Sequence, residues 1–140
     1  MNVEVYYYTR TGNTEKLAGA IAEELGVSAK EIGLPLEKKA DILFLGSAPY
    51  AGKVDSAIRG FIEENADKIG VIAVFGSSAS GLSTYTKIKE FAEEKGVRVF
   101  GKFYNCPGSF LFVHKGRPND SDLAGAASFA RLVYDAEKQS

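Results

Sequence analysis

The sequence contains little of what disulfides, metal centres and nucleic-acid surfaces are built from. Its 140 residues include one cysteine, Cys106, one histidine, His114, and no tryptophan. A single cysteine excludes an intramolecular disulfide. One cysteine and one histidine are also too few ligands for a Cys/His metal cluster within one chain. Lysine and arginine number 17 against 18 acidic residues, a net charge of -1. This balance gives no electrostatic reason to expect nucleic acid or an anionic membrane as a partner.

Long hydrophobic runs are also missing. No apolar run approaches the ~20 residues that cross a bilayer, and Met1–Tyr6 has neither the basic segment nor the cleavage site of a signal peptide. We therefore expect a cytoplasmic protein with no membrane contact. Hydrophobic residues make up 45% and charged residues 25%, which is typical of a globular chain and not of a disordered one. The length is that of one domain, so we expect residues 1–140 to form a single domain.

Apolar runs alternate with helical patterns along the chain. Strands are expected at Val3–Tyr8, Asp41–Ser47, Val71–Phe75 and Val97–Tyr104, with a weaker edge strand at Val27–Ile32. The second and third runs are apolar at almost every position, which indicates central strands buried on both faces.

Four stripes of apolar residues at helical spacing separate these strands. They span Leu17–Leu25, Val54–Ile62, Ile88–Ala92 and Leu123–Val133. Gly26 and Gly96 are expected to end the first and third helices, and Asn119 or Asp120 to cap the last. Only Gly33–Ala40 lacks a helical pattern between strands. The alternation predicts an α/β fold, a parallel sheet covered by helices on both faces in three α/β/α layers.

In such open sheets ligands bind at the carboxyl ends of the strands, so the segments that follow strands are the candidates. After the first strand comes a run of threonines with a glycine, leading into the first helix. Threonine hydroxyls can donate to phosphate oxygens, the glycine allows close backbone approach, and the helix N-terminus favours an anion. We interpret this run as a phosphate-binding loop formed by Thr9, Arg10, Thr11, Gly12, Asn13 and Thr14. The alternative is an ordinary capped helix start.

The pattern Thr9-x-Thr11-Gly12-Asn13-Thr14 resembles the phosphate-binding loop of flavodoxins, and the resemblance covers nearly the whole chain. The chain length and an uninterrupted fifth strand resemble the short-chain flavodoxins. The resemblance implies a five-stranded parallel sheet of order 2-1-3-4-5 with FMN as the cofactor. It also implies that the threonine-rich loop holds the FMN phosphate and that two later loops enclose the isoalloxazine ring.

Two later segments resemble these flavin-contacting loops. The first follows the third strand and consists of Ser47, Ala48, Pro49, Tyr50, Ala51 and Gly52. The second follows the fourth strand and contains Gly76, Ser77, Ser78, Ala79, Ser80, Gly81 and Tyr85. Tyr50 offers an aromatic face for stacking, and the small residues of the second loop can bond to the pyrimidine edge of a flavin. Tyr85 is expected to cover the other face. The alternatives are an ordinary proline-glycine turn and a flexible loop capped by Ser83.

These features favour an FMN-binding electron-transfer protein that shuttles single electrons between redox partner proteins, a reductase and an acceptor. We expect a monomer with no metal and no catalytic residue, more an electron carrier than an enzyme with turnover. The alternative is a small NAD(P)H-dependent FMN or quinone reductase on the same fold. A receiver-type signalling domain is disfavoured because the strand ends lack an acidic cluster. Cys106 is expected to be a small buried hydrophobe without a redox role.

Overall fold

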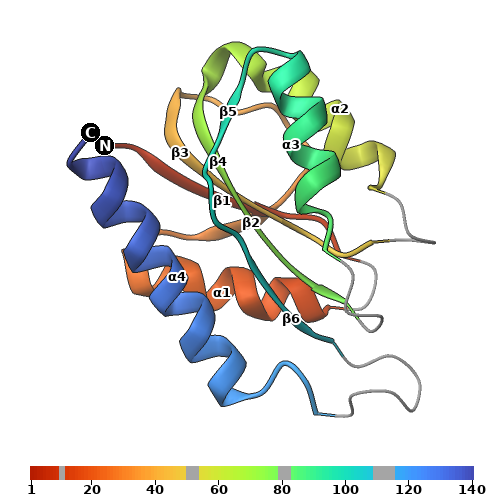
Figure 1. The fold of residues 1–140 in the computed structure, drawn as a ribbon, viewed down its shortest axis with the longest axis vertical. Helices are drawn as coiled ribbons and strands as arrows, with labels where there is room; N and C mark the ends of the chain where they lie inside the picture. The colour runs from red at the N-terminus through yellow and green to blue at the C-terminus, as the bar shows by residue number, and fades with distance from the viewer. Residues whose placement is uncertain (10–11, 50–53, 79–82, 109–115) are drawn as a thin grey trace.

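The computed structural model describes residues 1–9, 12–49, 54–78, 83–108 and 116–140. Strands and helices alternate along it (Figure 1), in the order predicted from the sequence. The elements are β1 (Val3–Tyr7), α1 (Asn13–Leu25), β2 (Ala29–Glu31), β3 (Ala40–Ser47), α2 (Ser56–Asn65), the 3-10 helix η1 (Ala66–Lys68), β4 (Ile69–Ser78), α3 (Tyr85–Glu94), β5 (Arg98–Val99), β6 (Tyr104–Pro107) and α4 (Asp120–Lys138). No described residue between Gly33 and Lys39 is helical, as the sequence pattern predicted.

The strands form one parallel sheet of order β2-β1-β3-β4-β5, with β6 also paired to β4. This confirms the predicted α/β class and strand order. The two central strands are buried along almost their whole length, in β3 from Ile42 to Ser47 and in β4 from Val71 to Ser78. Their continuous apolar runs are explained by this position, because helices cover them on both faces.

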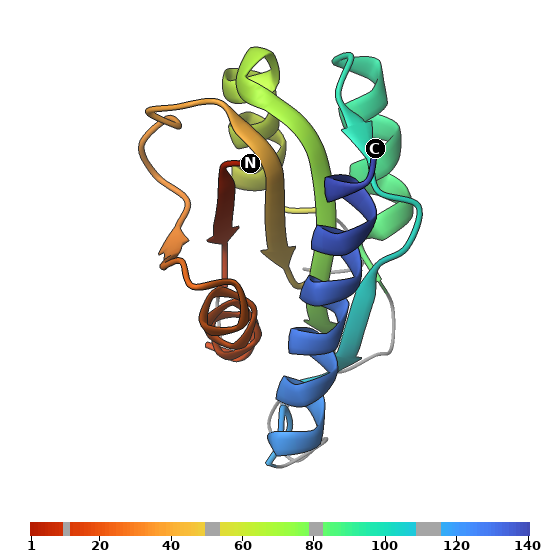
Figure 2. The same ribbon diagram turned by 90° about the vertical axis from the view of Figure 1, so that its left-hand side faces the viewer.

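Two hydrophobic cores lie on opposite faces of the sheet, and consecutive strand residues alternate between them. Ile42 and Phe44 of β3 face a core shared with α1 and α4, whereas Leu43 and Leu45 face a core shared with α2 and α3. Figures 1 and 2 show the same division, with α4 running beside α1 on one side of the sheet. The period of two along a strand therefore produces the three layers.

The predicted fifth strand, Val97–Tyr104, is wrong in one respect, because it is two short strands and not an uninterrupted one. Val99 pairs with Ile72 and Tyr104 with Phe75. Five steps on one strand (99 to 104) thus match three on its neighbour (72 to 75), which leaves two extra residues in a bulge. Two extra residues preserve the side-chain alternation, so both segments keep the same faces toward the cores. The signal in the sequence is Gly101, since a glycine inside a strand pattern often marks a bulge.

The helix ends follow the predicted caps. Gly26 ends α1 in the left-handed conformation, with φ 70°. Asn119 begins α4 with a capping box, in which its side chain accepts from the Asp122 N–H and the Asp122 carboxylate accepts from the Asn119 N–H. In the part of the chain that the structure describes, no helix is long and apolar enough to cross a membrane.

Candidate functional site

The carboxyl ends of β1, β3, β4 and β6 meet along one side of the sheet, which we call the carboxyl edge. Tyr7 is paired with Gly46, Ser47 with Gly76, and Ser77 with Cys106. The three segments predicted to bind phosphate and flavin therefore all leave the sheet at this edge. Their predicted convergence follows from the strand order, because β1, β3 and β4 are neighbours.

The first segment turns from β1 into α1 through Thr9 and Gly12. The Gly12 N–H donates to the Thr9 side-chain oxygen Oγ1 at 2.9 Å. Gly12 has φ 85°, a conformation that favours glycine, and it stands at the N-cap without a side chain to cap the helix. By contrast, α2 begins with a side-chain cap from Asp55 and α4 with one from Asn119. The positive end of α1 thus lies at the carboxyl edge with a glycine as its N-cap residue.

Asn13 and Thr14 are buried at the start of α1 and face the sheet. Asn13 is 7% exposed and Thr14 0%. The Thr14 hydroxyl lies 3.1 Å from the Ser77 hydroxyl, so a hydrogen bond joins the start of α1 to the end of β4. Thr14 therefore ties the first predicted loop to the second, and its donation to a phosphate stays a prediction.

A second hydroxyl pair ties the other two segments together. The Ser47 hydroxyl, at the end of β3, lies 3.2 Å from the Thr84 hydroxyl, just before α3. Both residues are buried. Ser47 was predicted in the site from the sequence, but Thr84 was not, because its only signal was its place before a helix. Ala48 and Pro49 continue the chain from Ser47 and are half-buried.

Glycines at the carboxyl edge stand where a side chain would not fit. A Cβ atom on Gly46 would lie 2.3 Å from the Phe75 ring and 2.9 Å from the Thr14 methyl group. A Cβ on Gly76 would lie 2.0 Å from the Ser47 carbonyl oxygen. The Phe75 ring and the Ser47 carbonyl therefore occupy the space that a side chain at Gly46 or Gly76 would need.

The segment after β6 also belongs to this edge, although its residues were not among the predicted site residues. The Gly108 N–H donates to the Ser78 carbonyl oxygen at 3.4 Å. A Cβ on Gly108 would lie 3.0 Å from the Asn13 amide nitrogen and 3.1 Å from the Ser77 Cβ. Gly108 therefore packs between the first and second predicted loops. The available signal was a glycine directly after a strand, Pro107 being its last residue.

Tyr85 is the first residue of α3, and its side chain is engaged with the β5–β6 segment. Its hydroxyl donates to the Phe100 carbonyl oxygen at 2.9 Å. Its ring stacks on Phe103 with centroids 4.5 Å apart and planes 20° from parallel. The predicted contact of Tyr85 with a flavin stays a prediction.

The predicted site residues that lie outside the described part of the chain are Arg10, Thr11, Tyr50, Ala51, Gly52, Ala79, Ser80 and Gly81.

An ion pair, Arg117 with Asp122, and a buried thiol, Cys106, lie near the start of α4 and in β6. Two Arg117 guanidinium nitrogens donate to the Asp122 carboxylate, both at 2.5 Å, and these bonds lower the pKa of Asp122. Burial raises the pKa of the Cys106 thiol to about 11, so this thiol is protonated at neutral pH. Cys106 is 3% exposed, as expected of a small buried hydrophobe. Among the described residues, no group of His, Cys, Asp and Glu is placed to hold a metal ion.

Comparison with known proteins shows the fold. No protein-family model matches the chain, and no curated protein sequence matches it. Among solved structures, it is similar to a flavodoxin from the domain Archaea, with a TM-score of 0.78, 21% identity and 99% of each chain covered. It is also similar to flavodoxin 2 from Bacillus cereus, with a TM-score of 0.71, 19% identity, and 97% of this chain and 99% of that one covered.

A further similar structure is a flavoprotein in complex with FMN from Lactobacillus acidophilus. The TM-score is 0.58 at 17% identity, with 76% of this chain and 92% of that one covered. These TM-scores establish the fold of the chain, and identities this low do not establish its activity. The chain thus has the flavodoxin-like fold that the resemblance in its first loop implied.

Proposed function

We propose that this flavodoxin-fold chain binds one FMN at the carboxyl edge and passes single electrons between redox proteins. The observation that carries the proposal is the convergence of the start of α1 with the carboxyl ends of β3 and β4 at one edge of the sheet. Gly12 is the N-cap residue of α1, and the ends of β1, β3 and β4 are paired side by side, Tyr7 with Gly46 and Ser47 with Gly76. A phosphate suits the helix start, and the ends of neighbouring parallel strands are where ligands bind in open α/β sheets.

The described residues fit FMN in the chemistry of their donors. Thr9 retains a hydroxyl hydrogen after accepting from Gly12, so it can donate to a phosphate oxygen. The first turn of α1 supplies backbone N–H groups and the positive end of the helix dipole. Ser78 ends β4 at the same edge, next to the predicted position of the ring. When bound, the flavin supplies one-electron chemistry, and the chain's own part is to bind it, orient it and exclude water.

The proposal assigns no catalytic residue, because electron transfer needs a positioned cofactor and not a proton-transfer or nucleophilic side chain. Cys106 takes no part, since its thiol is buried and protonated. The partners are a reductase and an acceptor that each contact the carboxyl edge. The NAD(P)H-dependent reductase is the alternative for the same fold.

A reduction experiment tests this function. The flavin-free chain is loaded with FMN, freed of excess FMN, reduced with light and a sacrificial donor, and mixed with oxidised cytochrome c as a generic one-electron acceptor. We expect two cytochromes reduced per FMN and no oxidation of NADH or NADPH above that of free FMN. Oxidation of NADPH faster than with free FMN would establish the reductase instead, and failure to retain FMN would overturn the proposal.

A further inference from the structure

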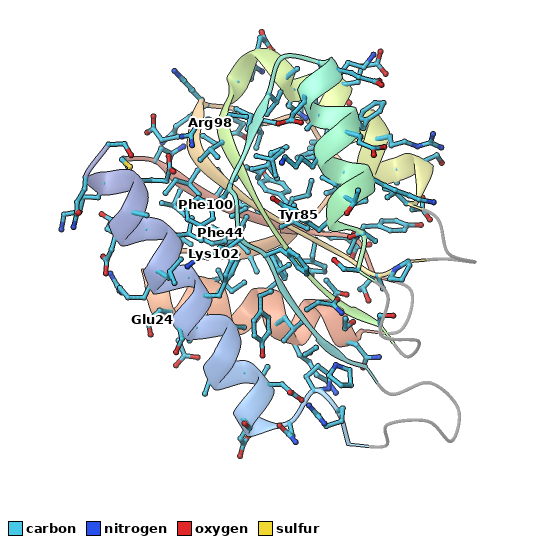
Figure 3. The ribbon with its side chains drawn as sticks, viewed as in Figure 1. Glu24, Phe44, Tyr85, Arg98, Phe100 and Lys102 are labelled. Carbon is cyan, nitrogen blue, oxygen red and sulfur yellow. The ribbon has the colours of Figure 1, made fainter. Side chains whose placement is uncertain are left out.

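The side chain of Ser77 is bonded to the start of α1, although its place after the fourth predicted strand suggested a contact with the flavin ring. Its hydroxyl lies 3.1 Å from the Thr14 hydroxyl, and the residue is only 2% exposed. Ser77 pairs with Cys106 of β6, and residues paired across neighbouring strands project to the same face of a sheet. Cys106 belongs to the core shared with α1 and α4, which also contains Phe44, labelled in Figure 3. The Ser77 hydroxyl therefore faces α1.

Gly108, directly after β6, packs against the same place. A Cβ on Gly108 would lie 3.0 Å from the Asn13 amide nitrogen and 3.2 Å from the Ser77 hydroxyl oxygen. Asn13, Thr14 and Ser77 are all buried. The end of β4, the end of β6 and the start of α1 thus meet in one buried contact, and each residue of this contact belongs to the described part of the chain.

This contact determines where the first turn of α1 lies on the sheet. Thr14 is held through both branches of its side chain. Its hydroxyl is bonded to Ser77, and its methyl group would lie 2.9 Å from a Cβ on Gly46. The N–H groups of the first turn have no partner within the helix, and they are the groups that would bind a phosphate. Their position therefore depends on the bond between Thr14 and Ser77.

We propose that Ser77 is a positioning residue for the phosphate. Through its bond to Thr14 it fixes the start of α1 on β4, and it thereby raises the affinity for the phosphate of FMN and not for the flavin ring. The inference rests on the proposed FMN function and assigns Ser77 to the phosphate half of the site. The two halves are separable by measurement, because a contact with the ring affects FMN and riboflavin alike, whereas an effect on the phosphate requires the phosphate.

Ser77→Ala removes the hydroxyl and keeps the rest of the side chain. The matched control is Tyr104→Phe, because the Tyr104 hydroxyl also joins a strand to the start of a helix. It donates from β6 to the Asp122 carbonyl oxygen in α4 at 2.8 Å. Thr14→Val removes the other hydroxyl of the pair with little change of shape, alone and combined with Ser77→Ala. Dissociation constants for FMN and riboflavin are measured well below the unfolding temperature of each variant.

We expect Ser77→Ala to bind FMN about 3- to 10-fold more weakly, the range for loss of one hydrogen bond, and to bind riboflavin as the wild type does. In the Thr14→Val background, Ser77→Ala should weaken FMN binding no further, because the bond is already lost. Tyr104→Phe should leave both constants unchanged. Gly108→Ala, whose Cβ would press on Asn13 and Ser77, should also weaken FMN alone, and it decides the question if Ser77→Ala does not fold.

Four results would overturn the positioning role while FMN binding stands. They are unchanged FMN binding in Ser77→Ala, an equal loss for both flavins, a further loss in the double variant, and the same loss in Tyr104→Phe. If the wild-type chain binds neither flavin, the proposed function fails first, and the positioning role fails with it.

Discussion

At the scale of single residues, two hydroxyl pairs and a few glycines set the geometry of the carboxyl edge. Thr14 with Ser77 and Ser47 with Thr84 join segments that are far apart in the sequence. The chain keeps these polar groups in a buried region because each of them satisfies another. The edge is therefore preorganised by side chains that need not touch a ligand at all.

Glycine at position 76 is expected to be irreplaceable for a steric reason. In Gly76→Ala the new Cβ would meet the Ser47 carbonyl oxygen at 2.0 Å, and backbone cannot move away cheaply. We expect the free energy of unfolding to fall by about 1–3 kcal/mol or more. Urea denaturation measures this change.

The matched control for Gly76→Ala is Gly60→Ala, in the interior of α2, where a Cβ meets nothing within 4 Å. Here alanine should stabilise the protein by about 0.5–1 kcal/mol, because glycine is the poorer helix former. Equal effects of the two substitutions would contradict the packing described for β4.

Thr9 is expected to contribute to binding of the FMN phosphate and not to binding of the flavin ring. Thr9→Val removes the oxygen that accepts from the Gly12 N–H and the hydroxyl that can donate to a phosphate. We expect FMN to bind about 10- to 150-fold more weakly, the range for a hydrogen bond to a charged group, about 1.5–3 kcal/mol. Riboflavin, which has no phosphate, should bind as it does to the wild type. A similar loss for both flavins would show that Thr9 holds the fold of the loop and not the phosphate.

The free energy of unfolding is expected to depend on pH through Asp122. Hydrogen bonds from Arg117, the largest cause, hold the pKa of Asp122 below its usual value. A carboxyl group with a depressed pKa in the folded state stabilises above its unfolded pKa of about 3.9 and loses this contribution as the pH falls. Asp122→Asn should therefore be less stable than wild type at pH 7, and the difference should shrink as the pH drops below about 4. Urea unfolding of both proteins from pH 7 to pH 3 measures it, and a constant difference would contradict the assignment.

At the scale of elements, the packing of β6 predicts low reactivity for the cysteine Cys106. Cys106 lies in the core between the sheet, α1 and α4, and its thiol pKa is raised to about 11. At pH 8 only about one thiol in a thousand is then ionised, compared with about a quarter of unfolded cysteines. We expect Ellman's reagent to react with the native chain at least about 100-fold more slowly than in denaturant. Reaction at the denatured rate would show that β6 is not packed as described.

The elements also show what sequence patterns predict and what they leave open. Strands β3 and β4 were predictable because continuous burial requires a continuous apolar run. The fifth strand was predicted as one run because Val97, Val99 and Phe100 are apolar, and apolar pattern does not report register. Its break depends on pairing with β4, a long-range contact that only Gly101 signalled. The hydroxyl pairs at the edge could not be predicted either, since their partners lie 63 and 37 residues apart.

At the scale of the whole molecule, the strand order places the candidate site. The order β2-β1-β3-β4-β5 reverses direction between β1 and β3, and ligands bind at such a switch point in open α/β sheets. The start of α1 lies at this point, so the strand ends that lead into the three predicted loops are adjacent. The sequence predicted this convergence from strand order and loop composition. It could not predict the hydroxyl pairs at the carboxyl edge, because these depend on packing between distant segments.

The central claim is that the start of α1 recognises a phosphate on a flavin, and one calorimetric comparison tests it. The flavin-free wild-type chain is titrated with FMN and with riboflavin under the same conditions. We predict one FMN per chain and an affinity at least about tenfold higher for FMN than for riboflavin, because charge-assisted bonds to a phosphate contribute about 1.5–3 kcal/mol each. Equal affinities for the two flavins, or no binding of either, would contradict the account.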